Sequence, residues 1–282
     1  MELEFLGTGG AVATPRPLCT CAVCAEARAK GVPYSRGGPS LFVHGPDLLI
    51  DTPEEIRLLL DRSRASRVEA VLYSHWHPDH TMGRRLIESM NVDFRGWPPQ
   101  DACTPVYLPQ QVAEDFGTYL GGREHLEFLA ERGVADPVTV PDGESIRLGG
   151  TTVNPFRLAE DYVYAFVLEE DGRRALVAMD ELNGWTPPSD LGHFDVAVLP
   201  VGVFEHDPRT GERKIAEEHP VLRAEATYDE TLAMIDALDA DRVYLTHVEE
   251  MNGLSHDDLR ELEAGLAGQG RPVTFAYDTL VV

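Results

Sequence analysis

Three histidines and an aspartate lie within six residues, in the segment His75-Trp76-His77-Pro78-Asp79-His80. In an extended chain the side chains of His75 and His77 point to the same side, so both imidazoles can bind one metal ion. Pro78 disfavours helix at His77 and turns the chain, which directs Asp79 and His80 toward a second ion. Neutral imidazole and carboxylate are the usual ligands of Zn²⁺ and similar ions. We therefore predict a two-metal site, with a polar loop of chance histidines as the alternative.

Two more residues of the ligand type follow apolar runs. Arg174–Met179 leads into Asp180, and Arg242–Thr246 leads into His247. A buried strand that ends in such a residue presents it at the carboxyl edge of the sheet, where open sheets place their sites. Taken alone, Asp180 would be a turn or capping residue, and His247 a hydrogen-bonded histidine at a strand end. Beside the segment His75–His80 both are predicted as metal ligands, and Asp180 can bridge two cations.

Three of the four cysteines cluster near the N-terminus, at Cys19, Cys21 and Cys24. Three thiolates at this spacing can bind one zinc ion. Reduced free cysteines are the alternative, and a disulfide is not expected in the cytosol. We therefore predict a structural zinc at this cluster, with Cys103 as a candidate for a further ligand.

The elements that must position these residues are short strands and amphipathic helices. Strand patterns cover Glu2–Leu6, Ser40–Val43, Leu48–Ile50, Val68–Tyr73, Thr104–Leu108, Val138–Val140, Ser145–Leu148, Thr151–Pro155, Tyr162–Leu168, Arg174–Ala178, Phe194–Pro200, Arg242–Leu245 and Pro272–Tyr277. Helical patterns cover Pro53–Ser63, Met82–Met90, Gln110–Gly133, Tyr228–Leu238 and His256–Gly265. Because strand runs precede helices in both halves, we predict an α/β fold, a four-layer αββα sandwich, in a single domain over residues 1–282.

The 282-residue chain is strongly acidic, with 48 Asp and Glu against 24 Lys and Arg and a formal net charge of −24. Such a surface repels polyanions, which argues against a nucleic-acid partner but not against a small anionic substrate held by metal ions. Excess carboxylate with scarce lysine also fits a halophilic protein, because concentrated salt screens self-repulsion. An acidic protein from a GC-rich genome is the alternative.

The sequence also bears on location. It contains no apolar run of about 18 residues that could span a membrane. The acidic start Met1–Phe5 is a strand pattern, whereas a signal peptide begins with basic residues and an apolar run. We expect a cytoplasmic protein without a membrane partner, and a homodimer is compatible with the sequence.

The pattern His75-x-His77-x-Asp79-His80 followed by Gly83 resembles the signature of the metallo-β-lactamase superfamily. The resemblance extends over nearly the whole chain. The segments Leu6–Gly10, Cys19–Cys24, Leu48–Asp51, Asp180 and Leu245–His247 occur in the order of one branch, which is similar to phosphoribosyl 1,2-cyclic phosphate phosphodiesterase. The resemblance implies the αββα fold, two divalent ions and phosphodiester hydrolysis.

The sequence departs from this branch at three positions. Glu160 stands where the branch has a histidine ligand of the first metal, which would favour Mn²⁺ or Fe²⁺ over Zn²⁺; Asp161, or no residue, is the alternative ligand. Glu225 falls where the branch has an active-site histidine, and His219 is the nearby histidine. Glu250 replaces the histidine that in the family completes the structural zinc site.

The ligand pattern predicts a metal-dependent hydrolase with a metal-activated water, and the resemblance implies that it opens a small cyclic sugar phosphate. Two adjacent cations, Zn²⁺ or Mn²⁺, lower the pKa of a shared water and offset charge on phosphate oxygens. Asp79 would orient the nucleophile, and His219 or Glu225 would protonate the leaving alkoxide. The alternatives are another hydrolase of the same fold, acting on RNA, a thioester or a lactone, and a non-catalytic metal-binding accessory protein.

Overall fold

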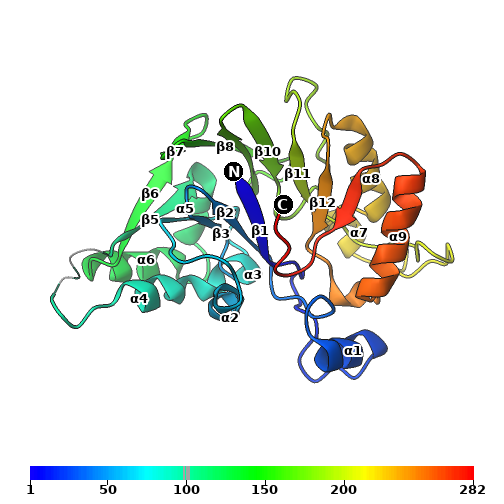
Figure 1. Ribbon diagram of the computed structural model, residues 1–282, viewed down its shortest axis with the longest axis horizontal. Coiled ribbons are helices and arrows are strands. Elements are labelled where there is room, and N and C mark those ends of the chain that lie inside the picture. The colour runs from blue at the N-terminus through cyan, green and yellow to red at the C-terminus, as the bar shows by residue number, and fades with distance from the viewer. Residues whose placement is uncertain (98, 100–101) are drawn as a thin grey trace.

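The computed structural model describes residues 1–97, 99 and 102–282, and its strands form two sheets (Figure 1). The first sheet has the order β1-β2-β3-β4-β5-β6, from β1 (Glu2–Gly7), β2 (Ser40–His44), β3 (Leu48–Ile50), β4 (Ala70–Leu72), β5 (Thr104–Pro109) and β6 (Ala135–Val140). The second has the order β13-β12-β11-β10-β9-β8-β7, from β7 (Ile146–Leu148), β8 (Thr151–Arg157), β9 (Tyr164–Glu170), β10 (Arg173–Val177), β11 (Val196–Pro200), β12 (Val243–Thr246) and β13 (Val273–Phe275). The first half of the chain therefore builds one sheet and the second half the other.

Helices flank the two sheets. The first half contributes α1 (Ala22–Lys30), α2 (Ile56–Asp61), α3 (Pro78–Thr81), η1 (Met82–Arg85), α4 (Leu86–Asn91), α5 (Gln110–Phe116) and α6 (Gly122–Glu131). The second half contributes α7 (Val221–Ala224), α8 (Tyr228–Ala237), η2 (Glu250–Asn252) and α9 (His256–Gly268). In Figure 1, α2, α4 and α6 lie below the first sheet, α8 and α9 lie on the right beside the second, and α1 projects away from both. Over the described residues, no helix combines the length and the apolar character that a membrane span requires.

Strand β10 illustrates how the layers pack. Ala175 and Val177 belong to the core that the two sheets share, whereas Leu176 and Ala178 belong to the core that α8 and α9 cover. Successive side chains of a strand point to opposite faces, so one strand contributes to two cores. This arrangement confirms the predicted αββα sandwich.

Parallel strands bring the chemical groups to one edge of each sheet. Strands β3, β4 and β5 run parallel in the first sheet, and β10, β11 and β12 in the second. Asp51 directly follows β3, and His75 lies three residues beyond β4. Asp180 lies three residues beyond β10, and His247 directly follows β12. The carboxyl ends of strands far apart in sequence therefore meet at one place.

Several helical segments differ from the sequence expectation, and two of them have a clear physical reason. The predicted helix Gln110–Gly133 is two helices, because the backbone at Leu120 and Gly121 has positive φ angles of 56° and 58°, which a right-handed helix does not contain. Helix α1 is not indicated by the sequence pattern. It buries only Cys24 and Ala27, so its residues show little of the period that marks an amphipathic helix.

Candidate metal centre and active site

One group of potential ligand atoms comes from His75, His77, Asp180 and Glu181, whose atoms lie within 4.8 Å of one another. His77 Nδ1 is 3.1 Å from Glu181 Oε1, and His75 Nε2 is 3.6 Å from Asp180 Oδ2. The ring of His75 is fully buried. Two imidazoles and two carboxylates in this arrangement suit one divalent cation.

A second group comes from Asp79, His80, Asp180 and His247, again within 4.8 Å of one another. His80 Nε2 lies 3.3 Å from Asp79 Oδ2 and 3.6 Å from Asp180 Oδ2. His247 Nε2 lies 3.3 Å from Asp180 Oδ1. Because Asp180 belongs to both groups, its carboxylate is placed to bridge two cations. The structure thus brings the His75–His80 segment, Asp180 and His247 together, as the strand ends predict.

The donor atoms of this centre fit bound cations. Four buried atoms have no hydrogen-bond partner among the described residues: Nε2 of His75, His80 and His247, and Oδ2 of Asp79. A buried polar atom left unpaired costs about 1–3 kcal/mol, so four at one place call for a missing partner. Imidazole nitrogen and carboxylate oxygen are the atoms that divalent metals bind, and the four residues would therefore hold such ions.

Asp51 supports the ligands from behind the centre. It is fully buried and has a φ angle of 61°. Its Oδ2 accepts a hydrogen bond from Ser74 Oγ at 2.6 Å and lies 2.7 Å from His80 Nδ1, while its Oδ1 accepts from Ser74 N at 2.8 Å. Ser74 Oγ in turn lies 3.0 Å from His75 Nδ1. These contacts hold the Nδ1 side of each ring, so that Nε2 of His75 and His80 faces the centre.

Carboxylates set the electrostatics of the centre. Burial lowers the pKa of His75 well below its usual range, and the neighbouring His80 lowers it further. Burial also opposes a charge on His247, but Asp180 and Asp79 outweigh it and raise the pKa of His247 to about 10. Despite burial, neighbouring carboxylates likewise raise the pKa of His80 well above its usual range. The carboxylates therefore favour positive charge at this place, which divalent cations would supply.

Glu160 does not lie in either group of ligand atoms, which corrects its predicted position. Its Oε1 accepts a hydrogen bond from Asn183 Nδ2 at 3.3 Å. Glu181 joins the first group instead, and its Oε2 accepts a short hydrogen bond from the hydroxyl of Tyr162. The reason lies in the backbone, because a φ angle of 49° at Glu181 lets the residue after Asp180 turn toward the same centre. The acidic pair Asp180-Glu181 at the end of an apolar strand is the signal that could have identified it.

Of the two predicted proton donors, only Glu225 reaches the centre. Glu225 lines a cavity of 180 Å³ together with Asp180, Glu181, His247 and Glu249. Burial and the charge of Asp180 raise the pKa of Glu225 to about 8.

His219 does not line this cavity. It is exposed, and its Nδ1 accepts a hydrogen bond from Val221 N at 3.2 Å. That contact closes a local turn before α7, so the structure gives His219 a position at the surface.

The cysteine cluster converges on one carboxylate. The Sγ atoms of Cys19, Cys21 and Cys24 lie 3.4, 3.1 and 3.0 Å from Glu250 Oε1, and the four residues form a third group of potential ligands. Cys24 is fully buried, and burial raises the pKa of its thiol to about 12. Three sulfurs and a carboxylate can complete a tetrahedral zinc site. Cys103 is exposed and does not belong to this group.

The sequence matches a known family over most of its length. Residues 45–248 match the profile of the Beta-lactamase superfamily domain, which is well over half of the 282 residues. The chain belongs to the beta-lactamase superfamily. Family and fold agree on the metallo-β-lactamase fold, and the two groups of ligand atoms would hold divalent metal ions. A search of curated proteins gives no match to its sequence.

Solved structures of the same fold cover the whole chain. A diphosphatase from the PhnP family is 22% identical with a TM-score of 0.71, over 100% of this chain and 96% of that one. Zn²⁺-bound PqqB from Methylobacterium extorquens is 17% identical with a TM-score of 0.75, over 100% and 99% of the two chains. The short form of human tRNase Z is 17% identical with a TM-score of 0.65, over 100% and 98%. These structures confirm the fold predicted for the superfamily.

Proposed function

We propose that this protein hydrolyses the phosphodiester bond of a small cyclic sugar phosphate. The observation that carries the proposal is the sharing of Asp180 by two groups of ligand atoms beside a cavity that Glu225 lines. Two divalent cations held by these groups would supply an acidified water and would offset negative charge on the phosphate oxygens. Side chains of the protein would orient the attacking water and protonate the leaving group.

Asp79 is placed to orient the attacking water. Burial opposes ionisation of its carboxyl group, but His80 and His247 outweigh burial and hold the pKa of Asp79 well below its usual range. An ionised carboxylate accepts a hydrogen bond from water and so directs a lone pair of the water oxygen at the phosphorus atom. Asp79 would therefore align the nucleophile in addition to serving as a ligand.

Glu225 is placed to protonate the leaving alkoxide. It lies directly after α7 and lines the cavity, and neither lysine nor arginine is among the lining residues in the described part of the chain. A carboxylic acid with a pKa of about 8 keeps its proton near neutral pH and can donate it as the ester bond breaks. Bound cations would lower this pKa, and the negative phosphate would raise it again.

The size and charge of the cavity favour a small anion. A volume of 180 Å³ lies below the roughly 300–1,000 Å³ of drug-sized ligand pockets, so the cavity favours a compact substrate. The formal net charge of −24 opposes long-range attraction of RNA. Two proteins of this fold are named as a diphosphatase and a tRNase, so chemistry at phosphorus is compatible with this architecture.

The test compares two substrates that differ in their leaving group. Protein loaded with Mn²⁺ or Zn²⁺ is assayed with phosphoribosyl 1,2-cyclic phosphate and with bis-p-nitrophenyl phosphate. The Glu225→Gln variant should lower kcat on the sugar phosphate by roughly 10²–10⁴-fold. The loss should be much smaller on the nitrophenyl ester, because nitrophenolate leaves without a proton.

The pH profile supplies a second readout. Protonated Glu225 is the active form, so the wild-type rate on the sugar phosphate should fall as pH rises through the pKa of Glu225, and the Glu225→Gln substitution should abolish this alkaline limb. Glu218→Gln, at an exposed residue before α7, is the matched control and should behave as wild type. Equal losses of kcat on both substrates would show that Glu225 is not the general acid. Absence of turnover of either substrate with either metal would contradict the proposed function.

A further inference from the structure

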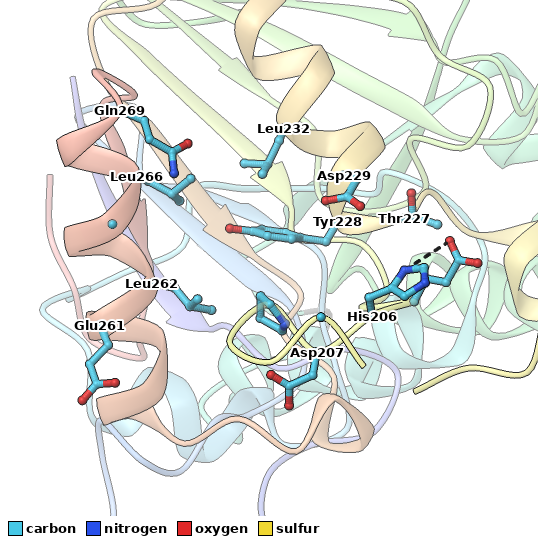
Figure 2. Close-up of a pocket in the computed structure, with 14 residues that line it drawn as sticks. His206, Asp207, Thr227, Tyr228, Asp229, Leu232, Glu261, Leu262, Leu266 and Gln269 are labelled. Carbon is cyan, nitrogen blue, oxygen red and sulfur yellow. Dashed lines mark ion pairs between the residues drawn. The ribbon is translucent and has the colours of Figure 1, made fainter. Parts of the chain in front are cut away.

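A second and larger cavity lies between α8, α9 and the loop of residues 205–211 (Figure 2). Its volume is 440 Å³, within the range of small-molecule sites. It is separate from the catalytic cavity, although one segment contributes to both. Glu225 and Ala226 line the catalytic cavity, whereas Thr227 and Tyr228 line the second one. The two cavities therefore both border the entry into α8 and share no lining residue.

Tyr228 presents an unpaired hydroxyl to this cavity. The side chain is only 8% exposed, and its hydroxyl has no hydrogen-bond partner among the described residues. The ring is held from behind by stacking on Phe204 and Phe275, at centroid distances of 4.5 and 6.4 Å. In Figure 2 its hydroxyl points across the cavity toward α9, where Leu262 and Leu266 project inward. The hydroxyl oxygen itself is not enclosed by protein, so a polar atom of a ligand in the cavity can reach it and pair with it.

The lining combines apolar surface with negative charge. Leu232 from α8 and Leu262 and Leu266 from α9 supply the apolar walls. The charged lining residues are four acids, and neither lysine nor arginine lines the cavity within the described part of the chain. Arg271 does not line the cavity, but its charge acts on the hydroxyl of Tyr228 from nearby. Because Arg271 is paired with Asp236 at 2.6 Å, the acids of the lining still favour a positively charged ligand.

The four acids are not equally available. Glu205 forms an ion pair with Arg213 at 2.5 Å, and Asp207 forms one with Arg209 at 3.2 Å. Asp229, in the first turn of α8, and Glu261, on α9, form no ion pair with the described residues. Asp229 stabilises the N-terminus of α8, yet its carboxylate stands beside Tyr228 at the cavity wall in Figure 2.

We propose that this cavity binds an amphipathic organic cation. Its ammonium or guanidinium group would pair with Asp229, with Glu261 adding to the negative field at the rim. Its apolar body would contact Leu262 and Leu266, and a polar atom would meet the hydroxyl of Tyr228. The proposal rests on groups outside the catalytic centre and does not depend on the reaction performed there.

Probes of one shape and three charges test this proposal. Tryptamine is the cation, tryptophol is its neutral analogue, and indole-3-propionate is the anion. Benzamidine and agmatine extend the cation series to guanidinium-type groups. Binding to the full-length protein is followed through the imidazole resonances of His206, which lines the cavity, and by calorimetry. At least one cation should shift the His206 resonances saturably, and tryptophol and indole-3-propionate should bind more weakly than tryptamine.

Two conservative variants locate the site. Asp229→Asn should weaken binding of the cation by about two- to five-fold, as expected for a partly exposed ion pair. Tyr228→Phe should weaken it by roughly two- to ten-fold, the range for loss of one hydrogen bond. Because the hydroxyl has no partner in the free protein, Tyr228→Phe should not lower the melting temperature, so weaker binding would not reflect unfolding.

Glu127→Gln, at an exposed carboxylate of α6, is the matched control and should bind the cation as wild type does. Failure of every cation to shift the His206 resonances would overturn the proposal. So would neutral and cationic probes of equal affinity, or affinities that neither Asp229→Asn nor Tyr228→Phe changes.

Discussion

Replacement of Asp51 by asparagine tests whether the ligands are held in place from behind. The Oδ2 atom of Asp51 lies 2.6 Å from Ser74 Oγ and 2.7 Å from His80 Nδ1, and both neighbours need an acceptor there. An amide has one oxygen and one NH₂ group, so the asparagine side chain cannot accept from Ser74 N, Ser74 Oγ and His80 Nδ1 as the carboxylate does. The variant also loses the negative charge that makes the His80 ring a stronger ligand.

The size of the effect follows from these contacts. Loss of such a supporting group typically costs 10–100-fold in metal affinity, or about 1.4–2.8 kcal/mol. The cation held by Asp79, His80 and His247 should be affected most, because His80 contacts Asp51 directly. The cation at His75 should be affected less, since that ring is reached only through Ser74.

The assay is competition for Zn²⁺ between the protein and a chromogenic chelator, with both binding steps resolved. Asp171→Asn is the matched control, because Asp171 also has a positive φ angle, 49° against 61° at Asp51, but lies in an exposed turn. Asparagine is tolerated at such angles, so the control isolates the loss of contacts from any backbone effect. Wild-type affinity for both ions in Asp51→Asn would refute the reasoning.

Three further predictions concern the metal sites and the surface. Glu181→Gln should lower the affinity for the cation at His77 by at least roughly tenfold, whereas Glu160→Gln should not; the reverse pattern, read by metal titration, would restore Glu160 as the ligand. Cys21→Ser should remove one equivalent of zinc and lower the melting temperature, and unchanged zinc content by elemental analysis would exclude a metal at the cysteine cluster. Salt at 1 M shortens the screening length to about 3 Å and so weakens the repulsion between surface carboxylates. The net charge of −24 therefore predicts a melting temperature that rises with KCl to molar concentration. A constant melting temperature would contradict the halophilic interpretation.

Much of the centre could be predicted because its signals are local. Only a few neighbouring residues carry these signals. They are the one-residue separation of His75 and His77 and the apolar runs before Asp180 and His247. Strand geometry then carries the inference, since the carboxyl ends of parallel strands in one sheet lie at one edge. The cysteine cluster was identified by the spacing of Cys19, Cys21 and Cys24, and the αββα order of the layers by the order of strands and helices along the chain.

Other features depend on how distant segments meet. Glu160 and Glu181 both follow β-strands and are chemically alike, and only the path of the backbone decides which carboxylate faces His77. Asp51 lies 23 residues before Ser74 and 29 before His80, so no short pattern links it to the ligands that it supports.

The sequence by itself therefore determined the ligand types, their strand-end positions and the class of fold, because periodicity and spacing encode local geometry. The tertiary structure alone decided the identity of the acidic ligand beside His77 and the support by Asp51, whereas the family resemblance had already implied the place of Glu250 beside the three thiols. It also decided that Tyr228 faces a second cavity. Each of these contacts joins segments whose relative position is set by packing of the two sheets and their helices, and packing is a property of the whole chain.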